Sequence, residues 1–246
     1  PSPVSAMLSA TLLNSAVLVI LRLVKLMALA GLGNTVQILM LIMGFLSIFI
    51  TAVYVYRIKN YKRMLAYSSV ENMGIIAIGI GLGSLATIGA LIHVLSHSLI
   101  KSSLFLTSGN ILHLYNSKEV NDVKNIYTKN KCTSWLWILG GMLILAIPPS
   151  PLFLSEFLII KQFFLNEQYI LCTIFVLLLT IVLYGIMSTI LKMNYSTDPN
   201  ETTEPVKIPV SSYLPQIVLI VTAIVLGIYM PNGLFNLILN AGGIIW

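Results

Sequence analysis

Charged residues are scarce in this chain of 246 residues: they make up 9% of the sequence, whereas 57% of the residues are hydrophobic. A water-soluble domain carries roughly 25% charged residues, so this composition cannot cover a surface that faces water. The composition therefore excludes a soluble globular domain. We predict an all-α, polytopic transmembrane bundle that forms a single domain over residues 1–246 and has the lipid bilayer as its solvent.

Cysteine is nearly absent as well, and the two cysteines, Cys132 and Cys172, form no CxxC pair and no metal-ligand pattern. A glycine-rich dinucleotide fingerprint is also missing. We therefore expect no cofactor, no bound metal and no redox centre in this chain. The net charge of +6 is scattered over loops between apolar runs, which argues against a nucleic-acid partner. The chain opens Pro-Ser-Pro without a methionine, so we expect that an amino-terminal part is missing.

Long apolar runs predict eight membrane spans. They are expected at Met7–Ala30, Val36–Tyr56, Asn72–Leu82, Ser84–Leu114, Ser134–Ile147, Leu152–Phe164, Tyr169–Met193 and Tyr213–Met230. The polar segment Asn116–Lys131 is expected to hold a short interfacial helix. Three prolines among residues 148–151 cannot continue a helix, so the chain must break there at membrane depth, where protein or a water-filled cavity lines the break.

Lysine and arginine in the loops give a first estimate of orientation. They gather in the basic patch Arg57–Arg63 and in the segment Asn116–Lys131. Counted over eight spans, this bias predicts that the 57–63 loop and the carboxyl terminus both lie in the cytoplasm.

Three ionisable residues recur every fourth position within the apolar run Ser84–Leu114. His93, His97 and Lys101 share one face of a helix, because four residues rotate a helix by only about 40° beyond a full turn. Lys101 lies too deep to reach a membrane interface, and an ionisable group at that depth is a functional-site hypothesis by default. Burial favours the neutral form of lysine, which makes it a reversible proton site, and histidine titrates near neutral pH. The pattern predicts a proton path.

A metal site is the alternative interpretation of this face, because histidines at positions i and i+4 are a common ligand pair. A third ligand is missing at a helpful spacing, and a lysine one turn further along would repel a cation. We therefore favour a proton relay.

Two glutamates lie in apolar surroundings. Glu156 follows the proline break by five residues, and we expect it to be a second relay group; the alternative is that it caps the helix that begins there. Glu71 lies at the start of the third expected span. An ion pair with Lys62 or Arg63 and an accessory role in proton uptake are equally compatible with its position.

The residues that carry these predictions resemble a known family. KRMLAYSSVENMG at 62–74, HVLSHSLIKSSLFLTSGNI at 93–111 and IPPSPLFLSEF at 147–157 are similar to the antiporter-like, proton-conducting subunits of respiratory complex I, Mrp-type antiporters and membrane-bound nickel–iron hydrogenases. The formate-hydrogenlyase type is the most similar. The resemblance implies inverted helical repeats, each with a broken helix, in a subunit of about fourteen helices. This chain matches the carboxyl-terminal part, with the second repeat complete.

The resemblance also implies roles for particular residues. His97 and Lys101 fall on the central-helix relay of such subunits, and Glu156 falls on the second broken helix, where relatives carry lysine or glutamate as the outlet. Many relatives place a lysine in the first broken helix, where this chain has Asn14. Because asparagine cannot hold a proton reversibly, the incoming half of the path uses other groups or is incomplete.

Three functions follow as hypotheses. The first is a proton-translocating subunit of a redox-driven complex such as a hydrogenase, a formate hydrogenlyase or an NADH dehydrogenase, in a prokaryotic plasma membrane. Its partners would be other membrane subunits and a peripheral redox arm. The second is a subunit of a multisubunit cation/proton antiporter. The third is a structural or non-functional fragment, for which Lys101→Ala and Glu156→Gln would leave proton pumping intact.

Overall fold

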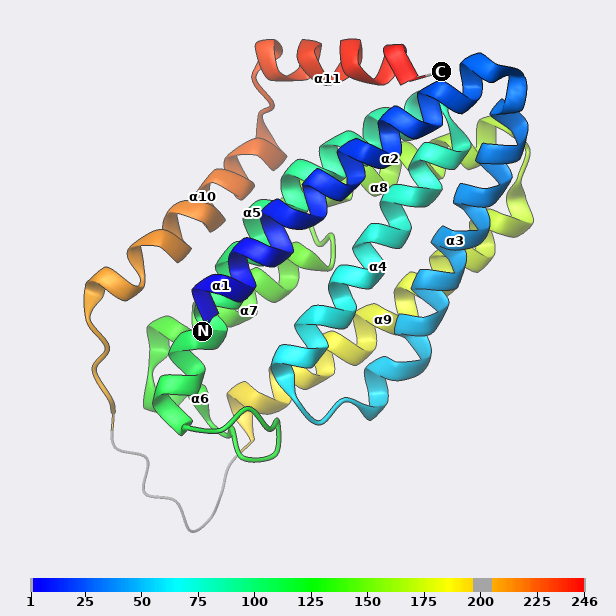
Figure 1. The fold of residues 1–246 in the computed structure, drawn as a ribbon. Helices are drawn as coiled ribbons and strands as arrows, with labels where there is room; N and C mark the ends of the chain where they lie inside the picture. The colour runs from blue at the N-terminus through cyan, green and yellow to red at the C-terminus, as the bar shows by residue number, and fades with distance from the viewer. Residues whose placement is uncertain (1, 197–204, 246) are drawn as a thin grey trace.

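The computed structural model describes residues 2–196 and 205–245. Pro1, residues 197–204 and Trp246 lie outside the described residues. Within these ranges the chain is helical without a β-strand, and one isolated β-bridge joins Asn60 to Glu119. Figure 1 shows long helices running side by side in an oblique bundle, as the sequence predicted. Five helical segments of the described residues are long and apolar enough to cross a membrane: Ser2–Arg57, Tyr61–Leu82, Ser84–Tyr115, Tyr169–Tyr195 and Val210–Ile228.

The first of these segments makes two antiparallel crossings. It consists of α1 (Ser2–Met7), the π-helical turn η1 (Leu8–Leu12), α2 (Leu13–Met27), η2 (Ala28–Leu32), α3 (Gly33–Tyr54) and η3 (Val55–Arg57). The chain reverses at Gly31, whose φ of 79° is accessible to glycine because it has no Cβ. The two spans expected at the amino-terminal end are thus confirmed as crossings, joined by a tight turn. We call Ser2–Met27 the N-terminal arm.

Helix α4 (Tyr61–Leu82) begins eleven residues before the span that the sequence predicted at Asn72. Its first turn is capped by the side chain of Asn60, which accepts hydrogen bonds from the amides of Lys62 (3.0 Å) and Arg63 (3.2 Å). Ser68, Ser69 and Glu71 in its first half are polar but buried against neighbouring helices, which is why hydropathy alone placed the start too late. On its other face, a Cβ on Gly74 would lie 2.8 Å from the Gly44 carbonyl oxygen of α3. The small residues allow the two helices to approach closely, as expected.

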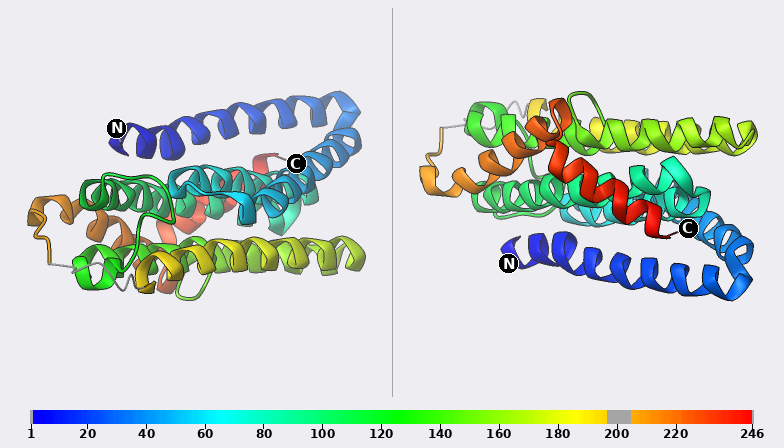
Figure 2. Two further views of the ribbon diagram at one scale, coloured as in Figure 1. Left: turned by 90° about the horizontal axis from the view of Figure 1, so that it is seen from below. Right: turned by 90° about the horizontal axis from the view of Figure 1, so that it is seen from above.

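Helix α5 (Ser84–Tyr115) lies at the centre of the bundle, in contact with α1, α4, α7, α8, α10 and α11. Figure 2 shows the N-terminal arm on one side, α4 and α5 in the middle and α9 on the opposite side. All three residues of the predicted row lie on this central helix. Because other helices pack around α5, the row lies in the middle layer of the bundle.

The proline break divides one crossing into two short helices. Helices α7 (Lys131–Ile144, 14 residues) and α8 (Pro151–Leu165, 15 residues) are each shorter than the ~20 residues that a span needs. Gly140 of α7 packs on Leu104 in the second half of α5, whereas Ser155 of α8 packs on Gly89 in its first half. The two helices therefore follow each other along α5 as halves of one crossing. The expectation of eight separate spans is corrected at this point.

The remaining elements are α6 (Ile126–Lys129), α9 (Tyr169–Tyr195), η4 (Val210–Ser212), α10 (Leu214–Ile228) and α11 (Asn232–Ile245). The short helix α6 lies in the segment where a short interfacial helix was expected. Helix α11 runs across the end of the bundle, where Gly242 lies beside Ile88 near the start of α5 (Figure 1). The 57–63 loop lies at the opposite end, since Asn60 pairs with Glu119 beyond the end of α5.

The predicted orientation is therefore wrong in one respect: the 57–63 loop and α11 lie at opposite ends of the bundle. The sequence prediction counted the broken crossing as two spans, so it assigned every later segment to the wrong side of the membrane. Helix α9 ends on the side of the 57–63 loop, because Lys192 in its last turn donates from Nζ to Asn121 Oδ1 at 3.0 Å.

Candidate functional site

The predicted row of ionisable residues lies in the interior of the bundle. The side chains of His93, His97 and Lys101 on α5 are all 0% exposed. Burial of this kind is rare for lysine unless the amine is paired. The partners of each residue therefore decide what the row can do.

Lys101 reaches across to helix α4. Its Nζ donates to the Leu65 carbonyl oxygen at 2.5 Å and to the Ser68 hydroxyl oxygen, and that hydroxyl in turn donates to the Leu65 carbonyl oxygen at 3.1 Å. Within the described residues, no carboxylate comes into salt-bridge contact with Lys101. The amine is held by neutral acceptors only, so no ion pair locks it into one protonation state.

His93 is held between two helices by both of its ring nitrogens. Nδ1 lies 2.8 Å from Ser155 Oγ of α8, and Nε2 lies 2.9 Å from Asn72 Oδ1 of α4. The amide of Asn72 donates to the Ser68 carbonyl oxygen at 2.6 Å, and the hydroxyl of Ser155 donates to the Leu152 carbonyl oxygen at 2.7 Å. A continuous polar network thus joins the broken helix, the central helix and α4.

His97 differs from its neighbours in the row. Both of its ring nitrogens are buried, and neither has a hydrogen-bond partner among the described protein groups. Buried polar groups are nearly always hydrogen-bonded to protein or to ordered water, and an unpaired one costs about 1–3 kcal/mol. His97 is therefore a buried imidazole, between His93 and Lys101 along α5, whose nitrogens lack a protein partner among the described residues.

Glu71 lies in this interior and not with the basic patch. Its side chain is 6% exposed, and it interacts electrostatically with Glu156 of α8 and with Lys101. Neither Lys62 nor Arg63 forms a salt bridge with it within the described residues. The structure therefore brings Glu71 together with the ionisable row.

Glu156 lies in the second turn of α8, directly after the serine that contacts His93, and is partly exposed. The alternative role predicted for Glu156, capping the start of α8, is filled by another residue. Ser150 caps α8 by accepting from the Leu152 amide at 3.2 Å, and its hydroxyl donates to the Leu143 carbonyl oxygen of α7 at 2.7 Å. Ser150 also ties the two halves of the broken crossing together.

The three other predicted positions lie outside the row. Asn14 on α2 donates from Nδ2 to Ser98 Oγ of α5 at 2.7 Å, while its Oδ1 is buried without a partner among the described residues. Lys62 donates to Ser2 Oγ of the N-terminal arm at 2.7 Å, and Arg63 is exposed.

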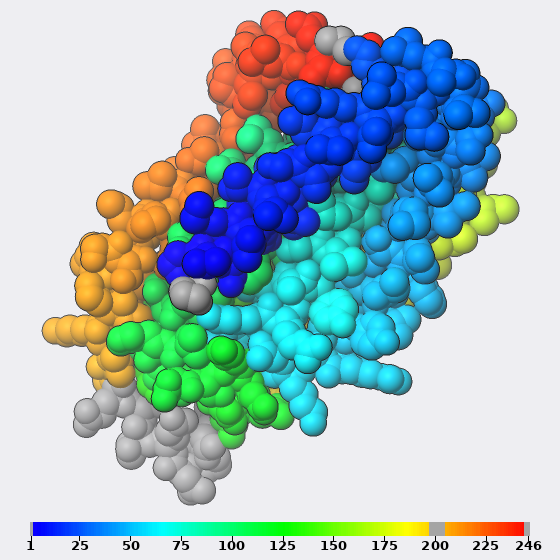
Figure 3. Space-filling model, in the orientation of Figure 1, coloured from blue at the N-terminus to red at the C-terminus, as the bar shows by residue number. Residues whose placement is uncertain are grey.

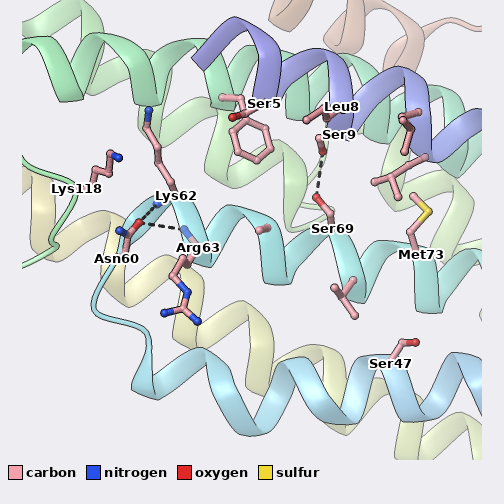
Figure 4. Close-up of a pocket in the computed structure, with 15 residues that line it drawn as sticks. Ser5, Leu8, Ser9, Ser47, Asn60, Lys62, Arg63, Ser69, Met73 and Lys118 are labelled. Atoms are coloured by element: carbon pink, nitrogen blue, oxygen red, sulfur yellow. Dashed lines mark hydrogen bonds between the residues drawn. The ribbon is translucent and has the colours of Figure 1, made fainter. Parts of the chain in front are cut away.

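Lys62 and Arg63 line a groove of about 680 Å³ between the N-terminal arm and α4, with Lys118 at the same end (Figure 4). Ser9 of the arm and Ser69 of α4 are hydrogen-bonded at 3.1 Å across this groove. The groove residues of α4 and the residues that contact Lys101 and His93 lie on different faces of the helix. The groove and the row are therefore separate features.

No group of three or more His, Cys, Asp or Glu side chains in the described ranges is arranged to hold a metal ion. The exposed Cys132 and the buried Cys172 are both free thiols. The chemistry that the interior offers is proton exchange between imidazole, amine and carboxyl groups.

Sequence reasoning missed the neutral residues that hold the row. Ser68 and Asn72 on α4 and Ser155 on α8 carry the hydrogen bonds to Lys101 and His93. Ser68 and Asn72 are four residues apart, so they share one helix face. This polar stripe within a span was the signal that could have revealed them.

Comparison with known proteins agrees with this architecture. Residues 1–183 match the family model described as "NADH:quinone oxidoreductase/Mrp antiporter, TM". The chain is 30% identical over 232 residues to the hydrogenase-4 component F homolog of Methylacidiphilum infernorum (isolate V4), a match that covers 94% of this chain and 48% of that relative. It is 32% identical over 137 residues to formate hydrogenlyase subunit 3 of Escherichia coli (strain K12), covering 51% of this chain and 22% of that relative.

A solved structure shares the fold. The archaeal membrane-bound sulfane sulfur reductase contains a chain that superposes on this one with a TM-score of 0.88 at 22% identity, covering all of this chain and 50% of that chain. The chain thus spans half or less of the length of these proteins. The resemblance seen in the sequence motifs is confirmed, and the chain belongs to the NADH:quinone oxidoreductase/Mrp antiporter transmembrane family.

Proposed function

We propose that this chain is a proton-translocating membrane subunit of a redox-driven complex of the hydrogenase, formate hydrogenlyase or NADH dehydrogenase-like type. One observation carries the proposal: three ionisable side chains in the central helix are fully buried, and none is neutralised by a salt bridge within the described residues. Ionisable residues within a membrane are costly to bury and are retained chiefly for ion pathways and proton relays.

The proposed relay consists of His93, His97, Lys101 and Glu156, and Glu71 joins it as a second carboxyl group. Lys101 gives up or takes up a proton at Nζ while its neutral acceptors on α4 hold the amine in place. In this proposal water bridges His97 to Lys101, since no protein group within the described residues contacts the ring nitrogens of His97. The charges of Lys101 and Glu156 both act on Glu71, so the protonation of Glu71 responds to theirs.

The driving force comes from partner proteins in this proposal. The partners are other membrane subunits and a peripheral redox arm, and the similar proteins are a hydrogenase component and a formate hydrogenlyase subunit. The chain functions as a single transmembrane domain in a prokaryotic plasma membrane.

The test replaces relay residues in the intact complex and measures proton pumping into sealed vesicles together with electron transfer. Lys101→Ala and Glu156→Gln are expected to abolish pumping through this subunit. Lys161→Ala and Glu167→Gln are matched controls, because both residues are exposed on or just after α8. Pumping at the control level in Lys101→Ala and Glu156→Gln would support a purely structural role and overturn the proposal.

A cation/proton antiporter subunit is the second candidate, since the matching family description includes Mrp antiporters. The two candidates differ in their driving force and not in the relay. An antiporter exchanges protons when a sodium gradient is imposed across vesicles without an electron donor. The redox-driven subunit moves protons only during electron transfer.

A further inference from the structure

We infer that His93 takes up and releases its proton at one nitrogen only, Nδ1, through the hydroxyl group of Ser155, while Asn72 keeps the other nitrogen permanently protonated. The inference rests on the proposed proton-translocating function. It assigns positioning roles to two neutral residues and changes the role of His93 from a point of passage to a terminal store.

The orientation of Asn72 determines the state of Nε2. The Ser68 carbonyl oxygen only accepts hydrogen bonds, so the group of Asn72 that lies 2.6 Å from it must be the amide Nδ2. The carboxamide oxygen Oδ1 therefore faces His93 Nε2, at 2.9 Å. An amide oxygen accepts a hydrogen bond but does not bind a proton near neutral pH, so Nε2–H donates to Asn72 in both protonation states of the ring.

The exchange takes place at Nδ1, which lies 2.8 Å from Ser155 Oγ. In neutral His93, Nδ1 accepts from the Ser155 hydroxyl. In the imidazolium, Nδ1–H donates to Ser155 Oγ, and the hydroxyl hydrogen turns to the Leu152 carbonyl oxygen, 2.7 Å away. One hydroxyl rotation satisfies both states, and no heavy atom has to move.

The proton balance of the step is simple. A protonated water molecule gives its proton to Ser155 Oγ and becomes neutral water, while the hydroxyl passes its own hydrogen to Nδ1. The new hydrogen stays on Oγ and points to the Leu152 carbonyl oxygen. The ring gains one positive charge, and no bond between heavy atoms forms or breaks. Release is the reverse of these steps.

This geometry closes the direct path from His93 to the rest of the row. A proton that enters at Nδ1 cannot leave from Nε2, because Asn72 is no proton acceptor. The titratable groups on the elements packed around the ring are Glu71 on α4, His97 and Lys101 on α5, and Glu156 on α8. His93 thus exchanges its proton through Ser155 of α8, and its charge acts on His97 only through space.

The tautomer is measured directly by ¹⁵N NMR of the histidine-labelled chain reconstituted in phospholipid bilayers, with the His93→Gln spectrum used to assign the signal. We expect neutral His93 to carry its hydrogen on Nε2, with Nδ1 bare and hydrogen-bonded. Ser155→Ala is expected to shift the Nδ1 resonance and to lower the ratio of protonated to neutral His93 about tenfold at a given pH, since a bond to the charged ring is lost. Ser155→Thr keeps the hydroxyl and is expected to restore the wild-type spectrum.

Ser96→Ala is the matched control. Ser96 of α5 is buried, as Ser155 of α8 is, and among the described residues its hydroxyl donates only to the Ile92 carbonyl oxygen. Neutral His93 with its hydrogen on Nδ1, or equal spectra for Ser155→Ala and Ser96→Ala, would overturn the inference. Proton pumping by the intact complex distinguishes a failure of this inference from a failure of the proposed function. If Lys101→Ala abolishes pumping while Ser155→Ala matches Ser96→Ala in the spectrum, the inference fails and the proposed function stands; normal pumping by Lys101→Ala refutes the function itself.

Discussion

Replacing Lys101 by methionine is expected to abolish proton translocation without destabilising the bundle. Methionine fills a similar volume with an unbranched apolar side chain, but it carries no proton. If Lys101 had a structural role instead, its removal would lower the free energy of unfolding. The sign of the stability change therefore separates the two roles of Lys101.

The expected magnitude follows from the contacts of Nζ. The substitution removes two hydrogen bonds, to the Leu65 carbonyl oxygen and to the Ser68 hydroxyl, each with a net value of about 0.5–1.5 kcal/mol. Against this, burying an ammonium without a carboxylate partner costs several kcal/mol. The Leu65 carbonyl oxygen keeps a donor, and Ser68 keeps one hydrogen bond, because the Ser68 hydroxyl still donates to that carbonyl at 3.1 Å. The free energy of unfolding is expected to stay the same or to rise.

The assay combines thermal unfolding of the chain in detergent with proton pumping by the intact complex in sealed vesicles. Lys101→Ala is the informative comparison for stability, since truncation of a large buried side chain leaves a cavity and costs about 2–5 kcal/mol. A Lys101→Met variant that loses more than about 2 kcal/mol of stability, or that pumps protons at the wild-type rate, refutes the reasoning.

Three further substitutions test other parts of the account. Glu71→Gln keeps the shape of the side chain and is expected to slow pumping at unchanged stability, whereas the exposed Glu119→Gln is expected to have no effect; equal rates for the two would remove Glu71 from the relay. Gly74→Ala is expected to lower the free energy of unfolding by about 1–3 kcal/mol, because its Cβ would lie 2.8 Å from the Gly44 carbonyl oxygen; an unchanged melting temperature would contradict this close packing of α3 and α4. Ser150→Ala removes the cap of α8 and its bond to Leu143, and a loss of about 1–2 kcal/mol in thermal unfolding is expected, against none if α7 and α8 are held together by other contacts.

Residue spacing alone predicted the core of the candidate site. Because a helix repeats every 3.6 residues, the positions of His93, His97 and Lys101 placed them on one face, and the length of the apolar run placed that face inside the membrane. The structure buries all three residues completely. Such predictions succeed because they depend on local helical geometry and not on how distant helices meet.

The features that the sequence did not reveal depend on contacts between helices. Serine and asparagine are common on membrane helices, so nothing local distinguishes Asn72 and Ser155 from other polar residues until α4 and α8 are placed against His93. The number of crossings failed for a similar reason. In the sequence, a proline break between two apolar runs looks the same whether the runs form two spans or two halves of one span. The packing of α7 and α8 one after the other along α5 shows that they are halves of one span.

The most direct test of the central claim is the number of protons pumped per electron pair by the complex that carries Lys101→Met, with Lys161→Met as the control on an exposed position. Electron transfer is measured in the presence of an uncoupler, so that a change in stoichiometry is not confused with a change in turnover. The proposed relay predicts a lower proton-to-electron ratio for Lys101→Met and a wild-type ratio for the control. A wild-type ratio in both variants, with electron transfer intact, would show that the buried row of α5 carries no protons.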